Sequence, residues 1–108
     1  MKTHEIEYDF IPLATVLIDE ETAATPIKEM VEFWCSGKER LRQAGGDYVK
    51  AWLTQLALHI LYNRQPPENG EEGWYPLDGT HGITLKAWSA WEPDEDSISI
   101  ESTLCPEN

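Results

Sequence analysis

Apolar and polar side chains alternate along two short segments near the N-terminus. Residues 5–10 alternate acidic and apolar side chains, and this period of two is typical of a half-buried strand. Residues 13–18 form a second run of β-forming side chains, with Val16 and Ile18 on one face. Pro12 separates the two runs and indicates a turn or an edge position. The pattern therefore predicts an antiparallel hairpin.

Helical spacing begins after residue 24. Thr25 and Pro26 are typical of an N-cap and a first helical position, because the hydroxyl can accept an amide hydrogen bond and proline lacks only an N–H that needs no helical partner there. The apolar face that follows consists of Ile27, Met30, Val31 and Trp34. Ser36 and Glu39 have capping-box spacing, so either a second helix starts there or one helix continues.

A long amphipathic helix is the strongest pattern in the chain. Gly45 and Gly46 can end the preceding helix, and Asp47 can cap the next one. Apolar residues then recur at the i, i+3 and i+4 positions of a helix: Val49, Trp52, Leu53, Leu56, Ala57, Ile60 and Leu61. We expect this helix to end near Asn63, before the two prolines that follow.

The remaining segments complete a mixed fold. Residues 65–82 are rich in proline, glycine and acids and are predicted to be irregular, whereas residues 83–88 and 97–102 alternate and predict two more strands. The order β-β-α-α-β-β predicts an α+β fold, a two-layer sandwich in which an antiparallel sheet of about four strands carries helices on one face. A length of 108 residues fits one domain over residues 1–108.

The chain is strongly acidic. Twenty Asp and Glu against eight Lys and Arg give a net charge of −12, and residues 66–108 hold ten acids and one base, Lys86. Such a field repels nucleic acid and anionic membranes and favours encounter with basic protein surfaces. Because no run approaches about 20 apolar residues and the N-terminus lacks a signal-peptide pattern, we expect a cytoplasmic protein that does not enter membranes.

Several short motifs resemble a known family. They are Glu7-Tyr8-Asp9-Phe10, Glu32-Phe33-Trp34-Cys35-Ser36-Gly37 with Arg40-Leu41, Gly45-Gly46-Asp47, Gly73-Trp74 with Leu77-Asp78-Gly79, and Gly82-Ile83. Together they resemble a short bacterial and phage family that is catalogued as a domain of unknown function. The resemblance covers most of the chain and implies a setting among accessory genes of bacteria, prophages and mobile elements. It implies no activity.

Candidate catalytic chemistry is confined to one loop. Asp78 and His81 lie between turn glycines and could form a base–orienter pair or share a metal ion. The sequence specifies no third ligand, and turn formation explains an aspartate followed by glycine. His59 is expected at the edge of the core, and His4 on an exposed strand. We therefore predict no catalytic residue, no metal site and no cofactor.

Aromatic and acidic residues past the long helix are the candidate binding residues. Trp74 lies in an acidic loop and Trp91 precedes another, and aromatic anchors rimmed by charge are typical of interface hot spots. The alternative is that these rings pack over the sheet as core, which is the placement expected for Trp88. The predicted partner-binding residues are Glu71, Glu72, Trp74, Trp91, Asp94, Glu95 and Asp96.

These patterns predict a non-catalytic acidic module that binds a basic protein surface and does not bind nucleic acid directly. A more specific hypothesis is that the module is a nucleic-acid mimic from a phage or mobile element. Such a mimic would inhibit a host nucleic-acid-binding or defence protein. Two alternatives remain open. One is a small hydrolase or metal-dependent enzyme that uses Asp78 and His81, and the other is a structural or oligomeric domain whose acidity serves only solubility.

Overall fold

The two alternating N-terminal segments form the predicted hairpin. A computed structural model describes residues 2–8, 11–34, 37–68, 71, 73–89 and 98–104. Strand β1 (Lys2–Tyr8) pairs antiparallel with β2 (Ile11–Ile18). The register shifts between Ile6 and Glu7, which face Ala14 and Pro12 respectively. Pro12 thus lies at a bulge, one of the few places where a central strand tolerates a residue without an N–H.

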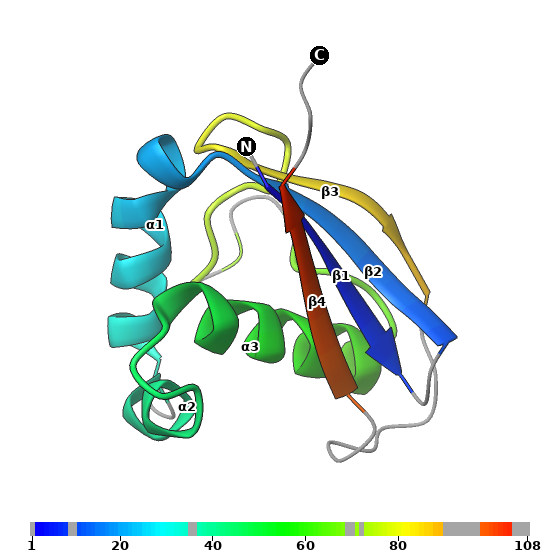
Figure 1. Ribbon diagram of the computed structural model, residues 1–108, viewed down its shortest axis with the longest axis horizontal. Helices are drawn as coiled ribbons and strands as arrows, with labels where there is room; N and C mark the ends of the chain where they lie inside the picture. Colours follow the sequence, from blue (N-terminus) through cyan, green and yellow to red (C-terminus); the bar gives the residue numbers. More distant parts are fainter. Residues whose placement is uncertain are drawn as a thin grey trace.

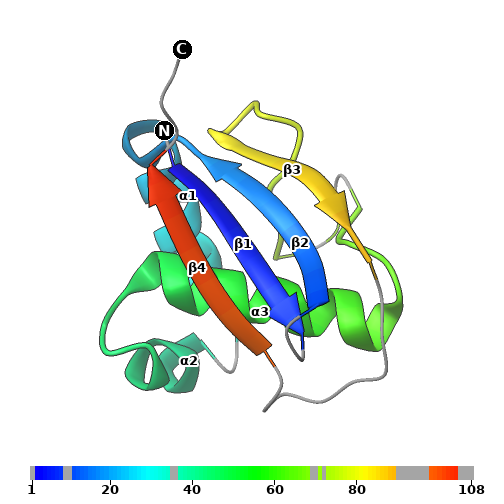
Figure 2. The ribbon, with the colours of Figure 1, turned by 45° about the vertical axis from the view of Figure 1, so that its right-hand side comes forward.

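One antiparallel sheet contains four strands. Strand β3 (Ile83–Trp88) pairs with β2, and β4 (Ile98–Leu104) pairs with β1, so the order is β3-β2-β1-β4. The hairpin therefore forms the centre of the sheet, and the two strands that follow the helices form its edges. The helices cover one face of this sheet (Figures 1 and 2). The predicted α+β fold with helices on one face is confirmed.

Three helices connect β2 to β3. They are α1 (Glu20–Phe33), α2 (Gly37–Gln43) and α3 (Tyr48–Asn63), so the chain starts a second helix after residue 34. The predicted start of α1 at Thr25 is wrong, because the helix begins at Glu20 and contains Pro26 in its interior. The early start places two acids in the first turn, where they complement the helix dipole. It also buries Ala23 completely, a gain of tertiary packing that local capping patterns do not reveal.

Helix α3 is the centre of the core. It begins as predicted, because the side chain of Asp47 accepts a hydrogen bond from the backbone N–H of Lys50 at 3.1 Å. It ends as predicted at Asn63, followed by Arg64 in the left-handed conformation. Its eight buried residues include the fully enclosed Trp52. Among the described residues, no helix has the length and apolar character needed to cross a membrane.

Two side chains lie where the pattern did not place them. Trp88, expected in the core, is 43% exposed, because it ends the edge strand β3, which has a neighbouring strand on one side only and whose last three residues are all exposed. His4, expected on an exposed strand, is only 3% exposed. Strand alternation puts His4 on the same face as Ile6, towards the helices, and burial lowers the pKa of its imidazole.

We predict that Gly37→Ala strongly destabilises the fold. A β-carbon at this buried position would lie 1.7 Å from the carbonyl oxygen of Val31, so the backbone of α1 or α2 would have to move. The expected loss is at least about 2 kcal/mol in the free energy of unfolding, measured by urea denaturation. Lys38→Ala, an exposed change on the same helix, is the control, and an equal effect of the two changes would contradict this account.

Candidate functional site

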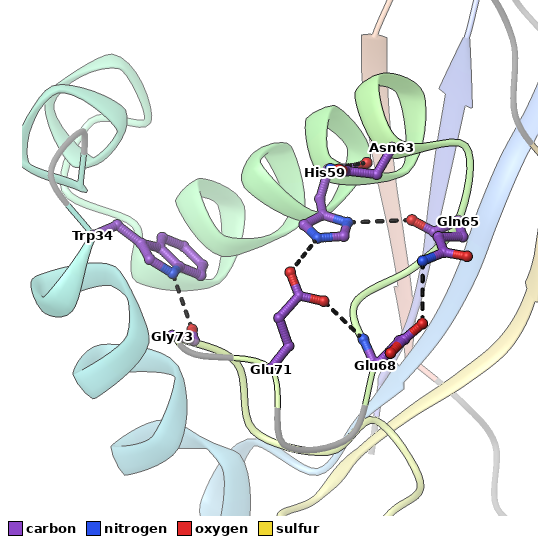
Figure 3. Close-up of polar contacts among 7 residues, drawn as sticks. All are labelled: Trp34, His59, Asn63, Gln65, Glu68, Glu71 and Gly73. Atoms are coloured by element: carbon purple, nitrogen blue, oxygen red, sulfur yellow. Dashed lines mark hydrogen bonds and ion pairs between the residues drawn. The ribbon is translucent and has the colours of Figure 1, made fainter.

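The segment after α3 is irregular, as predicted, and folds back onto the helices. Figure 3 shows its polar attachments. The imidazole of His59 on α3 places Nε2 2.9 Å from a carboxylate oxygen of Glu71 and Nδ1 3.2 Å from the carbonyl oxygen of Gln65. The oxygens of Gln65 and Glu71 are both acceptors. The two contacts can therefore both be hydrogen bonds only when each ring nitrogen of His59 carries a hydrogen. The indole N–H of Trp34 donates to the carbonyl oxygen of Gly73 at 3.0 Å.

The ring of Trp74 also holds the segment after α3 in place, through contacts with other rings. Its centroid lies 4.8 Å from that of Trp34, 5.9 Å from that of Trp52 and 5.4 Å from that of His59. The last two contacts are edge-to-face, a favoured arrangement of aromatic rings. Trp74 is therefore half-buried against the core, and part of its surface stays accessible.

A hollow of about 260 Å³ lies where this segment meets α1. Its lining consists of Glu29, Met30, Phe33, Gly73, Trp74 and Tyr75. The volume is slightly below the ~300–1,000 Å³ that is usual for cofactors and drug-sized ligands. Phe33 is 60% exposed. Its ring therefore forms an accessible wall of the hollow and is not part of the buried core. We define these six residues as the aromatic pocket.

Two tyrosine hydroxyls bind carboxylates of α1. Tyr75 donates to Glu29 at 2.5 Å, and Tyr48 donates to Glu32 at 2.9 Å. Each hydrogen bond to a carboxylate raises the pKa of the tyrosine, because ionisation would remove the donated hydrogen and would also place two negative charges together. The two glutamates are three residues apart, so they lie on one exposed side of α1. The bond from Tyr75 orients the carboxylate of Glu29 in the aromatic pocket, and the bond from Tyr48 orients that of Glu32 in a neighbouring hollow.

The predicted binding residues have different environments. Trp74 lines the aromatic pocket, and Glu71 is attached to His59 and to the backbone N–H of Glu68. These two hydrogen bonds, from His59 first, hold the pKa of Glu71 below its ordinary value. Glu72, Trp91, Asp94, Glu95 and Asp96 lie outside the described residues.

Asp78 and His81 have separate structural contacts. Asp78 accepts a hydrogen bond from the backbone N–H of Thr80 at 3.0 Å, and the bonds from Thr80 are the main cause of its lowered pKa. The ring of His81 packs on Tyr75 with centroids 4.7 Å apart. Within the part of the chain that the structure describes, no three His, Cys, Asp or Glu side chains are grouped to hold a metal ion.

Comparison with known proteins points to phages. The chain is 27% identical over 101 residues to protein ea10 of Escherichia phage lambda, an alignment that covers 79% of this chain and 82% of that protein. The same values hold for the lambda prophage-derived protein ea10 of Escherichia coli. This similarity supports the phage association, although not the particular motifs or the catalogued domain. No protein-family model matches the chain, and no solved structure matches it.

Four residues of the site are not among the predicted binding residues: Glu29, Phe33, His59 and Tyr75. Of these, His59 is expected at the edge of the core, Phe33 belongs to a motif of the family resemblance, and Tyr75 follows Trp74 in the acidic loop. Phe33 had a usable signal, because it lies off the apolar face formed by Ile27, Met30, Val31 and Trp34. A large aromatic residue on the polar side of an amphipathic helix indicates a contact outside the main core.

We predict that the attachment of the segment after α3 to His59 through Glu71 weakens at acidic pH. The folded-state pKa of Glu71 is depressed below its ordinary value of 4.5, so its contribution to stability is complete above pH 4.5 and is lost as the pH falls through the folded pKa. Amide hydrogen exchange at Glu68, which donates to this carboxylate, should accelerate over that interval after correction for intrinsic exchange. Glu71→Gln should remove the pH-dependent component, and its persistence in that variant would contradict the assignment.

We predict that Gly73→Ala disturbs the aromatic pocket. The φ angle of Gly73 is +86°, and a β-carbon would lie 3.1 Å from the indole nitrogen of Trp34 and 3.2 Å from the ring of Phe33. Gly46→Ala is a matched control, because Gly46 has a φ of +89° and nothing within 4 Å of its β position. Gly46→Ala should cost about 1 kcal/mol from backbone strain alone. Gly73→Ala should cost more and change tryptophan fluorescence, and equal costs would disprove the contact.

Proposed function

We propose that this chain is a non-catalytic acidic interaction module, of phage or mobile-element origin, that binds a basic surface on another protein in the cytoplasm. The observation that supports this most directly is the aromatic pocket, in which accessible rings stand beside an oriented carboxylate. Aromatic anchors with a charged rim are typical of protein interfaces. The small volume of the pocket favours a side chain of a partner over a cofactor or substrate.

The distribution of charge also supports a basic partner. Lys2 pairs with Glu20, and Arg42 pairs with Glu39, so these two bases neutralise carboxylates of the first 65 residues. Residues 66–108 contain ten acids and one base. A chain with a net charge of −12 attracts cationic surfaces over roughly a Debye length, about 8 Å at physiological ionic strength. The attraction would accelerate association and discriminate against acidic partners.

The sharper form of the proposal is a nucleic-acid mimic. In this form the carboxylates of Glu72, Asp94, Glu95 and Asp96 stand for phosphates, and Trp74 and Trp91 supply apolar contacts. Glu71, also predicted as a binding residue, has both carboxylate oxygens engaged with His59 and Glu68 and instead holds the segment in place. The partner would be a host protein whose basic surface ordinarily binds nucleic acid. The similarity to proteins of a phage and of a prophage is consistent with this role, because a phage gains from blocking such proteins.

We predict that partner binding depends on salt and on the acids past α3. Protein captured from a bacterial extract at low salt should be released at high salt, because screening shortens the range of the attraction. Simultaneous Asp94→Lys, Glu95→Lys and Asp96→Lys should weaken binding of that partner about tenfold or more. The control Glu5→Lys, Glu7→Lys and Glu21→Lys makes the same change of six charge units elsewhere. Unchanged affinity after the first set of reversals would refute the mimic.

A further inference from the structure

The aromatic pocket has the chemistry to recognise one type of basic side chain. We infer that it receives an arginine side chain of the partner, with the guanidinium group between the aromatic walls and Glu29. This inference rests on the proposed function and identifies the contact by which the chain recognises its partner. The features that support it are the composition of the lining, the orientation of its carboxylate and the contrast with two other hollows on the molecule.

The lining is aromatic on several sides and carries one charge. Phe33, Trp74 and Tyr75 contribute rings, Met30 and Gly73 contribute apolar surface, and Glu29 is the charged member. A cation within about 6 Å of such rings is attracted by their negative faces. Guanidinium is planar and weakly hydrated, so it stacks on rings with a smaller loss of hydration than the compact ammonium group of lysine.

The carboxylate of Glu29 is oriented before a partner arrives. The hydroxyl of Tyr75 binds its Oε1 atom at 2.5 Å, and the backbone N–H of Tyr75 lies 3.4 Å from the sulfur of Met30. A carboxylate can accept about four hydrogen bonds, so Glu29 can still bind a guanidinium N–H. Fixing the acceptor in advance reduces the entropy lost on binding.

The two other hollows lack this combination. One lies beside Tyr48 and Glu32, with a volume of about 430 Å³, but Lys38 is part of its lining. The other contains Lys2 and Lys50 together with Glu20 and Asp47. A lysine in the wall repels an incoming cation and competes for the carboxylates. Of these three hollows among the described residues, the aromatic pocket, whose lining has a carboxylate and no base, is therefore the one suited to arginine.

The test uses two synthetic peptides of equal charge, Lys-Lys-Arg-Lys-Lys and Lys-Lys-Lys-Lys-Lys, each with blocked ends. They are titrated at low salt into the full chain labelled with ¹⁵N, and binding is followed by NMR. The arginine peptide should bind about three- to tenfold more tightly. Its largest chemical-shift changes should occur at residues 29–33 and 73–75 and at the indole N–H of Trp74.

Three variants separate this pocket from general acidity. Glu29→Gln and Phe33→Ala should remove the preference for arginine, and both alter exposed side chains, so unchanged resonances of the core will verify folding. Glu21→Gln makes the same change of charge as Glu29→Gln on the same helix and should keep the preference. Equal binding of the two peptides, or shift changes elsewhere, overturns the arginine pocket and leaves the acidic module in place. Binding of neither peptide overturns both.

Discussion

The packing of Trp74 against the helices is the interaction on which the candidate site depends. The segment after α3 has little regular structure of its own, so its position must come from tertiary contacts. The ring of Trp74 meets Trp34, Trp52 and His59, which belong to different parts of the layer of helices. The sulfur of Met30 lies 3.3 Å from the indole nitrogen of Trp52 and 3.4 Å from the backbone nitrogen of Tyr75. These contacts join α1, α3 and the irregular segment into one unit.

The attachment of this segment also determines where charge is presented. Tyr75 reaches Glu29 only because its backbone is held against α1, and the resulting pair places a carboxylate beside accessible rings. Glu71, by contrast, turns towards His59 and the backbone of Glu68. The two acids therefore have different roles in the structure. Glu71 attaches the irregular segment to the core, whereas Glu29 of α1 lies beside the accessible rings of the aromatic pocket.

The arrangement is consistent with an acidic protein of phage origin. A small chain with an excess of acid gains solubility and repels nucleic acid, but solubility alone does not explain an exposed phenylalanine beside an oriented glutamate. Exposed aromatic surface is unfavourable in water, and the proposed binding role would cover it. The similarity to phage and prophage proteins supports the setting in which such a role is proposed.

The sequence by itself determined the β1–β2 hairpin, the buried face of α3, the capping of α3 by Asp47 and its end at Asn63. These features depend on alternation, helical spacing and caps, which act between residues close in the chain. Tertiary structure decided the start of α1, the burial of His4 and the exposure of Trp88, since each depends on which layer covers the residue. It also decided the strand order and the meeting of Phe33 with Trp74 and Tyr75. Residues about 40 positions apart meet only through packing of the whole fold. Because the hydrophobic effect is non-directional, the local sequence does not specify which distant residues come into contact.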